Sequence, residues 1–290
     1  MKKILIATLV LFTVAAAAQE KSKPVDVAVK QVNDRRTNGH FAQLAISLEL
    51  PKVPTLEVAA SRVLISRAVD ETGRDLLDPE AQEPELETNH RAGLGGKADP
   101  STPVTVSVTL KNPDRKATKV KEVRGEIELF MPGKDASSVA EIPKFLSLAG
   151  KPLTHKALKA NGVEIALLTT AQVEAEKKKR ADAKKKEYAE MGFAGEDLEN
   201  MIKSFMESLL GVQESELLAR VKDPKGRIQE ISYVDAAGDV KPVMMRDEEG
   251  MTLLSTWAGK PEPDWKMRIS MKTSKNVVRY AFALNDVALP

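Results

Sequence analysis

The chain of 290 residues contains no cysteine and only three histidines. Without cysteine there can be no disulfide, no thiol nucleophile and no lipid-modified cysteine, so packing alone must stabilise the fold and a lipoprotein is excluded. His40, His90 and His155 lie far apart, and none has a second histidine or an acid three or four residues later. This spacing excludes a helical metal-binding pair, and surface histidines are the simpler interpretation.

The apolar run at the start of the chain is too short to span a bilayer, which takes ~20 residues. This run, residues 4–14, follows Lys2 and Lys3 and precedes the small residues 15–18. The order of charged, apolar and small residues is typical of a secretory signal peptide over residues 1–18. We therefore expect cleavage after Ala18 and export to the periplasm or the extracellular space.

Removal of that peptide leaves no net charge. The formal charge of +2 reflects 44 basic against 42 acidic residues, and Lys2 and Lys3 supply the whole excess. A nucleic-acid partner requires a net basic chain or a concentrated basic face. The neutral exported chain therefore excludes nucleic acid as the expected partner.

Apolar residues at every second position predict half-buried strands. The alternation covers residues 44–50, 104–110 and 123–130, with turn-forming residues between these segments. It returns at 267–271 and 278–284, on either side of a polar turn, and this predicts a terminal β-hairpin. We therefore expect a mainly β chain.

The expected fold is two immunoglobulin-like β-sandwich domains, a first at 22–133 and a second at 134–290. A helical hairpin is inserted in the second domain at about 171–216. Its first segment, 171–192, lacks Pro and has seven basic and five acidic side chains, whereas 193–219 has one basic and six acidic side chains. Folding the two segments together would neutralise their charges.

The second helix of this hairpin is amphipathic. Leu198, Ile202, Phe205 and Leu209 lie on one face, at spacings of three and four residues. This apolar stripe either packs on the protein's own sandwich or docks a partner or a membrane surface. At a membrane, the neighbouring lysines would attract anionic lipid. All four residues are candidates for partner binding.

Two further pairs of residues are candidate sites. Trp257 and Trp265 flank a Gly- and Pro-containing loop that could present them to a glycan or a peptide, and core packing is the alternative interpretation. Asp70 and Asp75 surround Gly73 and are weak candidates for a calcium site, because Asp and Gly are also ordinary turn formers. No motif predicts a catalytic residue or a cofactor.

The segments 68–76, 109–114 leading into 123–127, and 282–290 are similar to those of uncharacterised exported bacterial proteins with immunoglobulin-like β-sandwich domains. The resemblance implies a fold and a compartment but no catalytic residue. We expect a non-catalytic binding or structural module of the bacterial envelope, whose partner is another envelope protein or a surface polymer. A carboxylate-dependent hydrolase and membrane-surface association through the helical hairpin are the alternatives.

Overall fold

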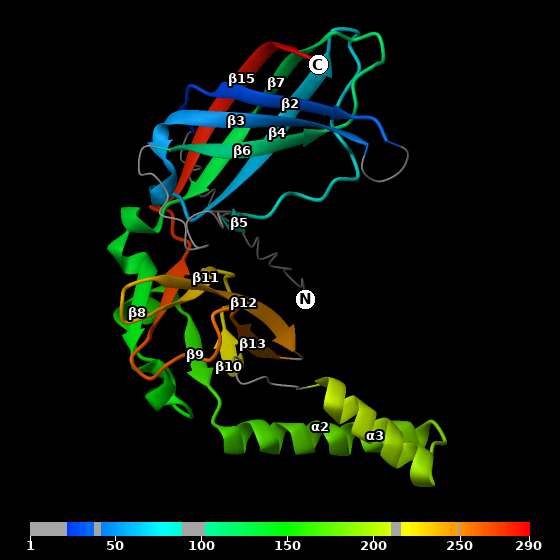
Figure 1. Ribbon diagram of the computed structural model, residues 1–290, viewed down its shortest axis with the longest axis vertical. Helices are drawn as coiled ribbons and strands as arrows, with labels where there is room; N and C mark the ends of the chain where they lie inside the picture. Colours follow the sequence, from blue (N-terminus) through cyan, green and yellow to red (C-terminus); the bar gives the residue numbers. More distant parts are fainter. Residues whose placement is uncertain (1–21, 38–41, 89–101, 210–215, 249) are drawn as a thin grey trace, which may run out of the picture.

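The computed structural model describes residues 22–37, 42–88, 102–209, 216–248 and 250–290 (Figure 1). It is mainly β, with 46% strand and 21% helix, as the alternating sequence pattern predicted. The predicted signal peptide, His40 and His90 lie outside the described residues.

Two sheets pack face to face in the part of the molecule that contains the chain's first strands (Figure 1). The first sheet has the order β1 (Lys23–Pro24), β15 (Val277–Ala288), β7 (Lys119–Phe130), β4 (Ala60–Asp70), β5 (Glu87–Thr88). The second has the order β2 (Ala28–Arg35), β3 (Gln43–Pro54), β6 (Pro103–Leu110). We call these two sheets the first unit.

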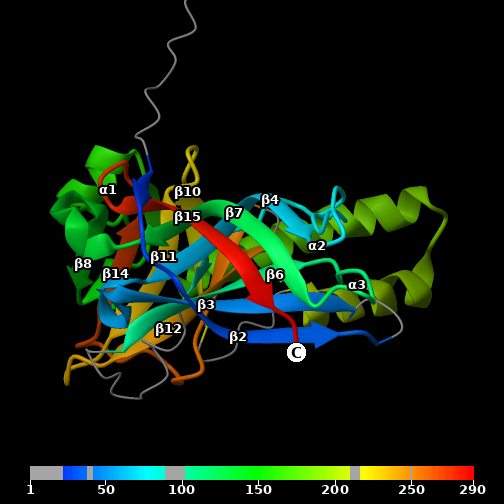
Figure 2. The ribbon, with the colours of Figure 1, turned by 90° about the horizontal axis from the view of Figure 1, so that it is seen from above.

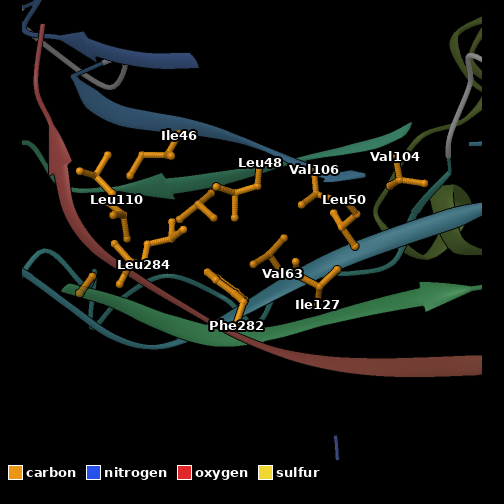
Figure 3. Close-up of a cluster of buried hydrophobic side chains, with 14 of the residues drawn as sticks. Ile46, Leu48, Leu50, Val63, Val104, Val106, Leu110, Ile127, Phe282 and Leu284 are labelled. Atoms are coloured by element: carbon orange, nitrogen blue, oxygen red, sulfur yellow. The ribbon is translucent and has the colours of Figure 1, made fainter. Parts of the chain in front are cut away.

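The core of the first unit forms because its strands alternate apolar and polar residues. Leu44, Ile46, Leu48 and Leu50 of β3 are all 0% exposed, while the residues between them are half-buried. Figure 3 shows Ile46, Leu48 and Leu50 meeting side chains of β4, β6, β7 and β15 between the two sheets. The strands predicted at 44–50, 104–110 and 123–130 are confirmed.

The predicted terminal hairpin is wrong. β14 (Lys266–Met271) pairs with β11 (Ile228–Val234) and β8 (Val139–Pro143), whereas β15 pairs with β7 from Val277↔Phe130 to Ala288↔Lys119. The last strand therefore returns to the first unit, so the expected uninterrupted second domain at 134–290 does not match the strand pairing. Alternation identifies a strand but not its partner, because two adjacent amphipathic strands fit a hairpin or two separate sheets equally well.

The described residues between β7 and β15 contain a seven-stranded sheet. Its order is β8, β14, β11, β12 (Val240–Glu248), β13 (Met251–Ser255), β10 (Glu216–Lys222), β9 (Glu164–Leu167). In this sheet, β12 pairs with β11 through residues 240–243 and with β13 through residues 244–248. Both edge strands contribute to one core, through Ile142 of β8 and Ile165 of β9, together with Leu158 of the short helix α1 (Lys156–Asn161). We call this sheet and its helices the second unit.

The sequence of residues 158–162 predicts a short helix that ends at a left-handed glycine, and the structure confirms it: α1 ends at Asn161, and Gly162 has φ 69°. The alternating pattern did not predict β12 or β13. Residues 132–143 lack that pattern and so predict irregular structure, but they contain β8 after two short 3-10 turns.

Two adjacent connections join the units. Met131 N donates to Asn276 O at 2.8 Å, and Thr273 Oγ1 donates to Asp135 Oδ2 at 2.8 Å. The Asn276 side chain is 0% exposed; its Oδ1 accepts from Thr273 N at 2.7 Å and its Nδ2 donates to Met271 O at 2.9 Å. The outgoing and returning segments are therefore cross-linked at the junction by hydrogen bonds.

A charged triad crosses three neighbouring strands on the outer face of the larger sheet of the first unit. Glu128 on β7 is 1% exposed and lies opposite Arg62 on β4 and Arg279 on β15. Its Oε2 is 2.6 Å from Arg62 Nε, and its Oε1 is 2.7 Å from Arg279 Nε. One buried carboxylate thus lies between two guanidinium groups, and Arg62 has a second carboxylate partner in Glu83 at 3.0 Å.

We expect Glu128→Gln to lower the free energy of unfolding by about 3 kcal/mol, because removing one partner leaves charge uncompensated in a largely buried site. Urea denaturation checks this value. Glu126→Gln, on the same strand but half-exposed and without an ion pair among the described residues, is the control and should cost less than about 1 kcal/mol. Equal losses in the two variants would contradict a special role for the triad.

Candidate functional site: a projecting helical arm

Two helices, α2 (Thr170–Glu190) and α3 (Gly195–Leu209), form a hairpin between the neighbouring strands β9 and β10. We call residues 170–209 the helical arm. Figures 1 and 2, taken at right angles, both show the far end of the arm reaching beyond the sheets. None of the described helices is both long and apolar enough to span a bilayer.

The base of the arm is attached to the second unit. α2 begins with a capping box, in which Gln172 N donates to Thr169 Oγ1 at 3.2 Å and Thr169 N donates to Gln172 Oε1 at 2.9 Å. Val173 packs on a small cluster that includes Leu218 and Leu253. Further along α2, Glu176 lies 3.8 Å from Arg220 of β10. The first turns of α2 are therefore held against the outer surface of the sheet.

The apolar stripe predicted on α3 is partly covered by α2, with which α3 packs. Leu198 is 8% exposed and Ile202 is half-buried, while the side chains of Phe205 and Leu209 lie outside what the structure describes. Lys185 of α2 donates to Glu199 of α3 at 2.6 Å, so the opposite charges of the two helices meet as predicted. Leu198 is consequently not available to a partner.

The tip of the arm presents apolar side chains. Met191 is 63% exposed and Phe193 is 41% exposed, on either side of Gly192, which ends α2 at φ 95°. The Phe193 ring meets the Tyr188 ring edge-on at 6.2 Å, and Phe193 N donates to Tyr188 O at 3.1 Å. Lys184 Nζ lies 5.8 Å from the centre of the Tyr188 ring. The tip is therefore an ordered aromatic corner with an exposed methionine beside it.

Sequence reasoning missed Met191 and Phe193, because they lie in a Gly-bracketed turn and not on a helical stripe. The available signal was local. Two large apolar residues flank a glycine in a segment that is otherwise dominated by charge. Such residues have no sequence neighbours to bury them unless another element folds over the turn.

The two tryptophans have opposite environments. Trp265 is 7% exposed and packs in the core of the second unit, 6.3 Å from the ring of Tyr233, so its interpretation as a partner-binding residue is corrected. Trp257 is 85% exposed on the turn that follows β13. Met244, which pairs with Ser255 of β13, is 47% exposed nearby on β12. Trp257 remains a candidate for binding.

Asp70 organises a turn. Its Oδ1 accepts from Thr72 N, Thr72 Oγ1 and Arg74 N at 2.7–2.9 Å, and its Oδ2 accepts from Asp114 N at 2.8 Å. Asp75 is exposed and accepts from Leu77 N at 3.0 Å. Donor hydrogens occupy the Asp70 carboxylate where a cation would bind, and the described residues contain no cluster of three His, Cys, Asp or Glu suited to a metal. His155 caps α1 by accepting from Ala157 N at 3.1 Å.

The pKa of Asp70 reflects this environment. Burial of the carboxyl group acts to raise its pKa, but the hydrogen bonds from Asp114, Thr72 and Arg74 outweigh burial and hold the pKa below its ordinary value. The adjacent Glu71 accepts from Thr118 N and from Thr118 Oγ1, and these bonds lower its pKa as well. Both carboxylates thereby fix the loop that leads from β6 to β7.

We expect Asp70→Asn to lower the free energy of unfolding at neutral pH by about 2 kcal/mol, the scale of lost hydrogen bonds to a charged group. Because the folded-state pKa is lowered, this stabilisation is present above the unfolded pKa of about 3.9 and is lost as the pH falls through the folded pKa. The variant should therefore lose less stability than the natural chain between about pH 5 and pH 2, measured by urea denaturation. The exposed Asp26→Asn variant is the control. If the Asp70 variant lost as much stability as the natural chain over this pH range, the stabilising role of the Asp70 carboxylate would be contradicted.

Comparisons of the chain with known proteins found no relative. No protein-family model, no curated protein and no solved structure matches the chain. The resemblance to exported bacterial proteins with immunoglobulin-like domains therefore stays a prediction, and the case for a function depends on the geometry of the described surfaces.

Proposed function

We propose that the chain is an exported, non-catalytic binding or structural module of the bacterial envelope, and that the helical arm contacts a partner protein through its tip. The observation that carries the proposal is the exposure of Met191 and Phe193 at the free end of an arm whose base is packed on the second unit. Aromatic and methionine side chains are enriched where proteins meet. Exposed together at an end that the sheets do not cover, they provide apolar area for a partner to bury.

The length of the arm supports the same role. α2 has 21 residues, which corresponds to ~30 Å at 1.5 Å per residue. The ion pair between Lys185 and Glu199 and the packing of Leu198 hold α3 against α2. The tip is thus presented at a distance from both sheets on a braced support, which reduces the entropy lost when a partner binds.

Charge near the tip favours a protein over an anionic membrane. Residues 184–186 are lysines, but residues 187, 190, 196 and 197 are acidic. Lys184 pairs with Glu187 at 2.7 Å, and Lys186 lies 4.0 Å from Glu190. A surface that attracts anionic lipid carries a net excess of basic residues, which this mixture lacks.

We also infer an immunoglobulin-like topology for the first unit. The order β2-β3-β6 and the order β15-β7-β4 correspond to strands A-B-E and G-F-C of such sandwiches, when the strands are lettered along the chain. In this interpretation the second unit is an insertion between strands F and G. Immunoglobulin-like sandwiches are common in cell-surface proteins, which supports a binding role without specifying the partner.

A carboxylate-dependent hydrolase has less support. A general acid acts with a pKa raised toward the working pH, whereas the hydrogen-bonded Asp70 and Glu71 have lowered pKa values. The buried Glu128 is held between two arginines and does not face a second carboxylate in the triad.

Export has a direct test. We expect the protein isolated from the periplasm or the culture medium of the cells that encode it to begin at Gln19, because signal peptidase cleaves after the small residues 15–18. Intact-mass measurement of the isolated protein checks this. A mature protein that keeps residues 1–18, or one confined to the cytoplasm, would contradict the proposal.

The arm has its own test, which uses a photo-crosslinking amino acid placed at position 193 in these cells. We expect a specific protein adduct, and we expect the double variant Met191→Ser with Phe193→Ser to weaken binding of that purified partner by tenfold or more, given about 1.5–3 kcal/mol for each buried apolar side chain. Val29→Ser with Leu56→Ser, which changes two exposed apolar residues of the first unit, is the matched control.

Three results would overturn the role of the arm. One is an absence of any adduct specific to position 193, and another is an equal loss of affinity in the two double variants. The third is co-sedimentation with phosphatidylglycerol vesicles that the tip variant abolishes, because this result would assign the arm to a membrane surface.

A further inference from the structure

One side of the first unit is open between its two sheets. β4 and β6 come from different sheets and contact each other. Among the described residues, β6 pairs with β3 alone, and β5 covers β4 only at Ala60 and Ser61. At the other end of β4, a single bridge joins Val69 to Asp75. The middle of β4 and the length of β6 therefore present backbone groups that no described strand pairs.

A groove of about 720 Å³ lies along these edges. β4 lines it with residues 61–65, β6 lines it with residues 106–110, and the segment 77–87 forms its third side. Val63, Val106 and Val108 are core residues that line it as well, each at most 9% exposed. The groove therefore offers unpaired strand edges above an apolar floor, which is the arrangement used for the addition of a strand.

The third side is acidic. Residues 78–87 contain five acids and no base. Two acids already have partners, since Asp78 lies 3.7 Å from Lys111 and Glu83 lies 3.0 Å from Arg62. Glu85 and Glu87 line the groove, are exposed and have no ion pair with any other described residue. The two basic side chains that line the groove, Arg62 and Lys111, thus already have acidic partners. The carboxylates of Glu85 and Glu87 remain available to a basic side chain of a ligand.

We propose that this groove binds an extended, lysine- or arginine-bearing segment of a partner protein by strand addition. The backbone of the segment pairs with the free edge of β4 or β6, and its apolar residues face the floor of the groove. Its basic side chains, on alternate positions, reach Glu85 and Glu87. A segment of about six residues spans ~20 Å, the length of an ordinary strand. This site lies on the first unit and is independent of the helical arm.

The test uses a blocked, labelled seven-residue peptide of alternating lysine and valine, and the full exported chain. Fluorescence anisotropy measures the Kd, and amide hydrogen exchange identifies the residues that the peptide protects. We expect saturable binding that weakens with salt, with protection in β4 and β6. A peptide of alternating glutamate and valine should not bind, and proline in place of the central valine should weaken binding because it removes a backbone donor.

Two double variants separate the groove from general electrostatic attraction. Glu85→Gln with Glu87→Gln should weaken lysine-peptide binding by about tenfold, the effect of two exposed ion pairs of somewhat under 1 kcal/mol each. Glu190→Gln with Glu196→Gln removes the same charge from the helical arm and should leave the Kd unchanged.

Four results would overturn the proposal. These are no binding of the lysine peptide at millimolar concentration, equal binding of the proline peptide, an equal effect of the two double variants, and protection outside β4 and β6. Association of the chain with itself through these strands, detected by sedimentation in the absence of peptide, would assign the edges to a second copy instead.

Discussion

The pairing of β15 with β7 is the constraint on which the rest of the structure depends. β7 supplies the centre of the larger sheet, and its neighbour on one side comes from the last residues of the chain. Phe282, Leu284 and Val287 of β15 complete the core that β3 and β6 begin. The first unit is therefore incomplete until the whole second unit has been synthesised, and contacts between residues this distant in sequence carry a large loop-closure entropy cost.

This constraint explains the form of the junction. Because residues 131–276 must leave beside β7 and return beside it, both ends of the second unit lie next to each other. The bonds of Asn276 and Asp135 satisfy the polar groups that this crossing would otherwise bury unpaired. Gln229 Nε2 of β11 also donates to Leu86 O of the first unit at 3.0 Å. Hydrogen bonds thus connect the second unit to the first at the two adjacent chain crossings and at the contact between Gln229 and Leu86.

The sequence was sufficient where burial depends on local pattern and insufficient where it depends on partners. The alternation of Leu44 to Leu50 predicted β3, and Gly162 predicted the end of α1, because each signal is contained in a few neighbouring residues. β12 was not predicted because its described side chains are half-buried or exposed on both faces, which leaves no alternation to detect. Trp265 precedes Met267 and Ile269 at the same two-residue spacing, so its burial had a local signal, whereas Trp257 lies on the turn after β13 and is exposed.

The distribution of charge explains why the two proposed surfaces stand out. The chain is rich in acids and bases, yet the most buried of those described serve the fold: Glu128 joins three strands, Asp70 closes a turn and Arg180 lies 3.5 Å from Glu176 within α2. Side chains used in this way are not free to contact a ligand. What remains is apolar area at the tip of the helical arm and unpaired carboxylates along the groove. Neither the exposed area of Met191 and Phe193 nor the carboxylates of Glu85 and Glu87 neutralises a buried charge of the described fold. Exposed apolar area of this kind is typical of interaction sites.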